Sequence, residues 1–188
     1  MTEPTTTERK SLSTYQLASY GAPSVPLSMV ALPLAVYLTP VYADSAGFGL
    51  SLAFVGLMLA LSRVFDGITD PIIGFMSDRI RTRWGRRKPF ILIGMPIFML
   101  GVWLLWIPPI EFREVTWLGM TFNTGYPYLL GVLVIMYVGA TIKDVPYSAW
   151  GAELAQGYNE RTLVMSWKEA FTVSGSLIGA MTPAVIVF

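Results

Sequence analysis

Three charged side chains interrupt an otherwise apolar stretch, and their spacing places them on one face of a helix. Arg63, Asp66 and Asp70 lie within residues 50–77, a run longer than the roughly 20 residues that cross about 30 Å of hydrocarbon as a helix. At about 100° per residue, Asp66 falls about 60° and Asp70 about 20° from Arg63 around the helix axis. Such charges are costly inside a membrane, so they predict either an ion site or a network of ion pairs that only holds helices together. Because two acids accompany one base, we favour a cation or proton site at Asp66 and Asp70, with Arg63 in its charge network.

A second polar stripe is expected in the apolar run 127–150. Tyr137, Thr141, Asp144 and Ser148 recur at helical spacing and share one face, because residues three and four apart lie on the same side of a helix. This stripe suits hydrogen bonds to a hydroxylated solute or an ion, and the alternative is a packing stripe with an ion pair between helices. Lys143 lies about 100° from Asp144, so we expect the two not to pair along their own helix and Lys143 to join a wider charge network.

A basic segment follows the first of these helices. Six basic residues stand there against one acid, Asp78: Arg79, Arg81, Arg83, Arg86, Arg87 and Lys88. In a soluble protein such a run could contact nucleic acid. Here it joins two apolar runs, and the positive-inside rule places it in the cytoplasm. We therefore expect no nucleic-acid partner and a cytoplasmic amino terminus.

The composition indicates a membrane protein and argues against an enzyme. Apolar residues make up 54% of the chain and charged residues only 13%, against about 25% charged in soluble domains, and the mean hydropathy is +0.56. The chain has no cysteine and no histidine, which removes thiolate chemistry and the commonest metal ligand and general base. Two carboxylates on one helix could also do acid–base chemistry, but no nucleophile–base pair or phosphate loop accompanies them. We expect no enzyme activity, no cofactor and no metal beyond a coupling Na⁺.

The apolar runs predict an all-α membrane protein with about five transmembrane helices, at residues 17–42, 50–77, 90–107, 127–150 and 163–188. A polar segment at 1–16 is expected to form a cytoplasmic tail. Four prolines fall in the first run and predict one kinked helix, because a proline inside a membrane span breaks backbone hydrogen bonds. We assign no chemistry to the outside connection at 108–126.

One long motif carries a resemblance to a known family. The string D-x-x-x-D-P-x-x-G-x-x-x-D-R begins at Asp66, and R-W-G-R-R-K-P-F-I-L-I-G follows and ends at Gly94. Together they resemble the signature of the glycoside–pentoside–hexuronide cation symporters of the major facilitator superfamily. The resemblance implies an amino-terminal bundle of the major facilitator type, which moves a sugar, glycoside or related polar solute with Na⁺ or H⁺ by alternating access. Family members have twelve spans in two halves, so we expect this chain to be the amino-terminal part, partnered by a missing carboxy-terminal half.

The resemblance also implies roles for individual residues. Asp66 and Asp70 match the cation-site acids, Asp144 matches a solute-binding aspartate, and Lys168 matches an arginine near the sugar. Thr141 and Ser148 complete the expected solute site beside Asp144. The cytoplasmic loop motif, implied to take part in gating, consists of Gly74, Asp78, Arg79, Gly85, Arg86 and Arg87.

Two departures from the family pattern leave the solute open. No acid stands at residues 26–29, where the family carries a sugar-binding aspartate, and Ser148 stands where the family has an aromatic residue. A non-sugar solute such as a lysolipid therefore stays an alternative, as does a truncated, non-transporting fragment or interaction protein. In each case the expected location is the cell (inner) membrane, in contact with membrane lipid.

Overall fold

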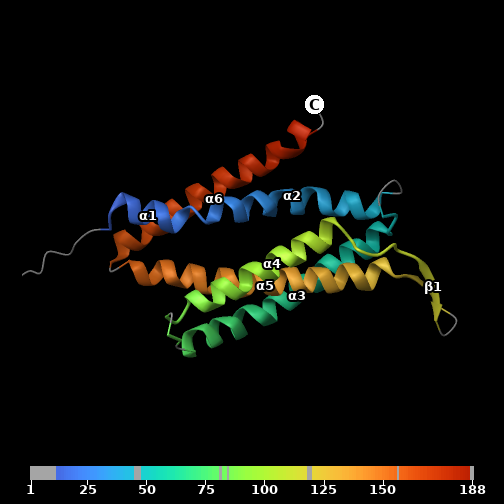
Figure 1. Cartoon of the computed structure of the whole chain (residues 1–188), viewed down its shortest axis with the longest axis horizontal. Coiled ribbons are helices and arrows are strands. Elements are labelled where there is room, and N and C mark those ends of the chain that lie inside the picture. The colour runs from blue at the N-terminus through green and yellow to red at the C-terminus, as the bar shows by residue number, and fades with distance from the viewer. Residues whose placement is uncertain are drawn as a thin grey trace, which may run out of the picture. The chain divides into compact units, whose positions relative to one another are not determined.

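The structure is almost entirely helical. The computed structural model describes residues 12–44, 48–80, 82–83, 85–117, 120–155 and 157–186. Its helices are α1 (Thr14–Gly21), α2 (Ser24–Ala43), α3 (Leu52–Arg79), α4 (Lys88–Trp106), α5 (Gly125–Leu154) and α6 (Tyr158–Ile186) (Figure 1). The predicted all-α membrane class is confirmed. Most of the expected tail, Arg81 in the basic segment and the last two residues of the fifth expected span lie outside the described residues.

The first expected span, 17–42, is two helices rather than one kinked helix. Helix α1 ends at Gly21, residues 22 and 23 form a turn, and α2 then continues through Pro26, Pro33 and Pro40. Pro26 lies in the first turn of α2, where a backbone N–H has no helical partner to lose. The expected interruption by prolines therefore falls at Pro23, where the helix breaks, whereas Pro33 and Pro40 lie inside a continuous α2. Helix α1 begins within the expected tail, where Ser13 and Gln16 form a capping box.

Four helical stretches among the described residues are long and apolar enough to cross a membrane. They are Thr14–Ala43, which takes in both α1 and α2, then Leu52–Arg79, Lys88–Trp106 and Gly125–Leu154. Helix α6 covers the fifth expected span and is 29 residues long, but it does not meet the same criterion of length and composition. Its first half carries Arg161, Lys168 and Glu169, which lower the mean hydropathy of that half.

The chain divides into two compact units. The terminal unit holds Met1–Pro33 and Gly151–Phe188, and the central unit holds Leu34–Trp150. In the terminal unit, α6 lies against α1 and the start of α2: Phe171 of α6 lies against Gly21, and Gly175 of α6 faces Val25 and Ser28. The candidate acids Asp66, Asp70 and Asp144 all belong to the central unit.

The core of the central unit surrounds α5. Buried residues from α2, α3, α4 and α5, with Leu50 just before α3, form one apolar cluster: Leu38, Tyr42, Leu50, Val55, Leu105, Leu129, Val132, Leu133, Met136 and Tyr137. Two tyrosine hydroxyls tie neighbouring helices to the last turn of α4, because Tyr42 donates to the Leu105 carbonyl and Tyr128 to the Leu104 carbonyl, each at 2.7 Å. These bonds satisfy carbonyls that the end of a helix leaves without an intrahelical partner.

Helices α4 and α5 approach closely because glycines stand at their contacts. A Cβ placed on Gly101 would lie 2.6 Å from the Met136 Cα, and one on Gly139 would meet the backbone of Phe98. Small residues at such positions let two helix backbones come together inside a membrane. This contact holds α5 rigidly beside α4 and so determines where the polar side chains of α5 can lie.

The connection between α4 and α5 contains a β-hairpin that we did not predict. Strands β1 (Glu114–Trp117) and β2 (Met120–Asn123) pair antiparallel, with Val115 opposite Phe122. The hydroxyls of Thr116 and Thr121 lie 3.1 Å apart across the pair, a favourable cross-strand contact. The hairpin has the alternation and β-branched residues of a strand pair, but it is too short to stand out from a loop in the sequence.

Candidate cation and solute site

The three charges on α3 lie on one side of the helix, as their spacing predicts. Arg63 Nη1 is 3.5 Å from Asp66 Oδ2, one turn along the helix. The Asp66 side chain is 20% exposed and that of Arg63 is 69% exposed. At this distance the pair is a weak hydrogen bond, so Arg63 compensates the charge of Asp66 without fully occupying its carboxylate.

Arg63 also contacts α5. Its guanidinium carbon lies 4.7 Å from the centre of the Tyr137 ring, a distance at which the ring face attracts a cation. Tyr137 belongs to the buried core, so this contact anchors the arginine against a fixed surface. The sequence places Tyr137 on the polar stripe of α5 but does not show that Arg63 would cover it.

Asp70 lies further along α3 and contacts α5 through a neutral donor. The Thr141 hydroxyl donates a hydrogen bond of 2.9 Å to Asp70 Oδ1. Thr141 is buried and Asp70 is exposed. Among the described residues, no basic side chain lies within ion-pair distance of Asp70. Asp70 therefore differs from Asp66, whose partner is a cation.

The expectation for Lys143 and Asp144 was wrong. Lys143 Nζ lies 2.7 Å from Asp144 Oδ1, so the two neighbours do pair on their own helix. Their backbone positions are about 100° apart, but the lysine stem is long enough to bend back toward the carboxylate. The angle between two helix positions therefore fixes the directions of their Cβ atoms, but it does not determine which partner the ammonium of a long lysine side chain reaches.

The remaining candidate solute residues are divided between the two units. Ser148 is half-buried on α5, in the central unit with Thr141 and Asp144. Lys168 lies on α6 in the terminal unit, where its carbonyl accepts a 3.0 Å hydrogen bond from the Thr172 hydroxyl. The structure thus places Asp70, Thr141 and Asp144 in one unit, and Lys168 in the other.

The loop motif joins the end of α3 to the start of α4. Arg87 Nη2 lies 3.2 Å from Asp78 Oδ1, and the Arg79 guanidinium stacks on the Phe75 ring at 3.8 Å. Gly85 has a backbone φ of +100°, which only glycine adopts readily. At the other end of the motif, Gly74 faces Val145 of α5, since a Cβ on Gly74 would lie 3.6 Å from that side chain. Arg86 is half-buried beside Arg87.

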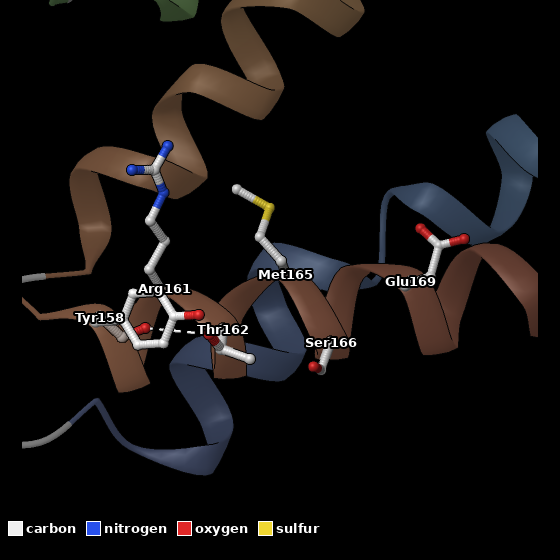
Figure 2. Close-up of a pocket in the computed structure, with 6 residues that line it drawn as sticks. All are labelled: Tyr158, Arg161, Thr162, Met165, Ser166 and Glu169. Atoms are coloured by element: carbon white, nitrogen blue, oxygen red, sulfur yellow. Dashed lines mark hydrogen bonds between the residues drawn. The ribbon is translucent and has the colours of Figure 1, made fainter.

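An open groove of about 500 Å³ on α6 was missed by sequence reasoning. Six side chains that recur every three or four residues line it: Tyr158, Arg161, Thr162, Met165, Ser166 and Glu169 (Figure 2). Their spacing along the sequence places all six on one face of a helix, and this pattern could have indicated the groove. Most of them are exposed to solvent, and within the described part of the chain no group of three His, Cys, Asp or Glu side chains could hold a metal ion.

Comparison with known proteins identifies the class. A sequence model of the family described as MFS/sugar transport protein matches residues 19–188, and the chain belongs to that family. The uncharacterized symporter sll1374 of Synechocystis is 37% identical over 161 residues, which is 85% of this chain and 28% of that protein. The inner membrane symporter YicJ of Escherichia coli is 26% identical over 170 residues, which is 90% of this chain and 35% of that protein.

A relative from an animal is named for its solute. The sodium-dependent lysophosphatidylcholine symporter 1 of Gallus gallus is 26% identical over 181 residues, which is 95% of this chain and 32% of that protein. The chain thus spans about a third or less of the length of each of these relatives. The predicted major facilitator type and the kinship to symporters are confirmed, and the long apolar helices fit an integral membrane protein.

Proposed function

We propose that this chain supplies the ion site and part of the solute site of a secondary active transporter, which moves a sugar or related polar solute together with Na⁺ or H⁺. Asp66 and Asp70 of α3 hold the ion, and Thr141, Asp144 and Ser148 of α5, with Lys168 of α6, contact the solute. Further spans from outside these 188 residues complete the translocation path. The names of the relatives support symport, and the family description supports sugar as the first solute to test.

The observation that carries the proposal is the hydrogen bond from Thr141 to Asp70. It joins the acidic face of α3 to the polar stripe of α5 at one point. A cation that binds Asp70 competes with or reorganises this bond, and α5 carries Asp144 one turn later. A ligand changes an equilibrium only through a difference in affinity between two states, and a shared contact of this kind provides such a difference for both ion and solute.

The charges explain why the site attracts a single cation. The three acids Asp66, Asp70 and Asp144 face two basic side chains within pairing distance, Arg63 and Lys143. One negative charge remains, and it belongs to Asp70. A Na⁺ ion or a proton at Asp70 makes this set of side chains neutral, which lowers the free-energy cost of holding charges inside the membrane.

The test is ion-coupled uptake by the full-length transporter in sealed membrane vesicles. We expect glucose, galactose, xylose or glucuronate to cause uptake of Na⁺ or H⁺, and an imposed ion gradient to drive accumulation of the same solute. Absence of both effects across this panel would contradict the sugar proposal. The 188 residues alone are expected not to transport, and uptake by them in liposomes would contradict the need for further spans.

The lysolipid alternative has one observation in its favour, the named solute of the Gallus gallus relative. It predicts Na⁺-dependent uptake of lysophosphatidylcholine by the same vesicles and no response to sugars. The two solutes are tested side by side in one preparation.

A further inference from the structure

Lys143 is a buried charged residue held in place by α4. The residue is 4% exposed, and its ammonium nitrogen lies 4.5 Å from the centre of the Phe98 ring. Gly94, one turn before Phe98, allows the backbone of α5 to come close, since a Cβ on Gly94 would lie 2.7 Å from the backbone nitrogen of Lys143. The lysine stem is therefore enclosed between two helices, and its charge has a fixed position.

The partner of Lys143 is only half enclosed. Asp144 Oδ1 accepts a 2.7 Å hydrogen bond from Lys143 Nζ. The Asp144 side chain is 53% exposed, against 5% for that of Lys143. Among the described residues, no hydrogen bond reaches the second oxygen, Oδ2. The pair thus hides its positive end in the protein and presents one carboxylate oxygen at the surface of α5.

A buried ammonium requires a reason, because taking it out of water costs several kcal/mol unless a partner compensates it. Asp144 and the Phe98 ring compensate it here. The benefit is reciprocal, because the lysine cancels the charge of Asp144 and holds one of its oxygens. What remains at the surface is a strong hydrogen-bond acceptor in a pair with no net charge.

We propose that Lys143 is a positioning residue that orients and neutralises Asp144, so that the site selects a neutral hydroxylated solute over a cationic one. The free oxygen accepts a bond from a solute hydroxyl, whereas an amino group gains no net ion pair because Lys143 already occupies that role. This inference deepens the proposed function and rests on it. It assigns to Lys143 an effect on specificity, which a residue that only fills space would not have.

The test compares neutral sugars with their amino derivatives in the full-length transporter. Equilibrium binding of glucose and glucosamine, and of galactose and galactosamine, is measured for the wild type and for Lys143→Met. Methionine keeps a flexible apolar stem and removes the charge. Arg113→Met is the matched control, because Arg113 also pairs with a nearby acid, Glu111 at 3.0 Å, but on an exposed connection.

We expect the wild type and the Arg113→Met control to prefer the neutral sugar of each pair. Lys143→Met should bind the neutral sugar roughly tenfold more weakly, because Asp144 loses the contact that fixes its orientation toward the sugar hydroxyl, a loss comparable to one hydrogen bond to a charged group. The same variant should bind the amino sugar more tightly than the wild type does, because the amino group then takes the place of the lysine charge. Equal losses for both sugars would show that Lys143 only packs, and would overturn the inference while leaving the proposed function intact.

A second variant covers the case in which Lys143→Met does not fold. Asp144→Asn leaves the lysine charge in place without its partner, so the ratio of glucuronate to glucose affinity should rise. An unchanged ratio would overturn the inference. Binding of none of these sugars by the wild type would instead overturn the sugar proposal itself, and the inference with it.

Discussion

The hydroxyl of Thr141 on α5 donates a 2.9 Å hydrogen bond to the carboxylate of Asp70 on α3. Thr141 was expected to serve the solute and Asp70 the cation, and the structure brings the two together. The two helices also meet at Arg63 with Tyr137 and at Gly74 with Val145, so the hydrogen bond lies in the middle of a continuous contact. Coupling between two ligands is a free energy that links their binding sites. We expect this hydrogen bond to transmit that coupling between the ion and the solute.

The first prediction concerns the acids of α3. Asp70→Asn should abolish ion-driven accumulation in vesicles, because the uncompensated negative charge that attracts the cation is removed. Asp66→Asn should do the same and leaves Arg63 without its partner. Downhill solute exchange should survive in part, since Asp144 lies on another helix. The control is Glu111→Gln, which removes an exposed acid, and ion-driven accumulation by Asp70→Asn would mean that the acids are only structural.

The second prediction separates the cation role of Thr141 from a solute role. Thr141→Val keeps the shape of the side chain and removes the hydroxyl, so the ion concentration for half-maximal solute binding should rise roughly tenfold, the value of one hydrogen bond to a charged group. Thr141→Ser keeps the hydroxyl and should resemble the wild type. If Thr141→Val instead weakens solute binding at saturating ion and leaves the ion requirement unchanged, Thr141 serves the solute alone.

The third prediction concerns the contact between α4 and α5. Gly101→Ala places a methyl group 2.6 Å from the Met136 Cα and should destabilise the protein by about 1–3 kcal/mol, as overpacking does. Gly131→Ala is the control, because nothing lies within 4 Å of its added Cβ, and it should be neutral or stabilise by up to about 1 kcal/mol. Thermal unfolding in detergent micelles measures both, and equal midpoints would contradict the close approach.

The fourth prediction concerns orientation. The chain has no cysteine, so a single introduced cysteine reports one position without background. We expect Thr82→Cys, in the basic segment, to react with an impermeant maleimide only after the cells are opened. Thr116→Cys, in the hairpin, should react in intact cells. Labelling of Thr82→Cys in intact cells would show that the basic segment faces the outside, opposite to the predicted topology.

The sequence by itself determined the class of protein and the face of α3 that carries its charges. Both depend on local properties: an apolar run of sufficient length predicts a membrane helix, and helical periodicity alone places Arg63, Asp66 and Asp70 on one side. The loop motif was also readable, because its glycines and charges are contiguous. Composition and spacing are enough for features of this kind.

Only the tertiary structure decided which side chains meet. The bond from Thr141 to Asp70 joins residues 71 positions apart, and no local pattern predicts it. The pairing of Lys143 with Asp144 was excluded on angular grounds, yet it forms because α4 encloses the lysine and directs its stem back to the neighbouring acid. Burial changes which partner a long charged side chain takes, since leaving the charge unpaired would cost more than bending the stem. The partners of the charges therefore depend on packing between helices, which the order of residues along one helix does not show.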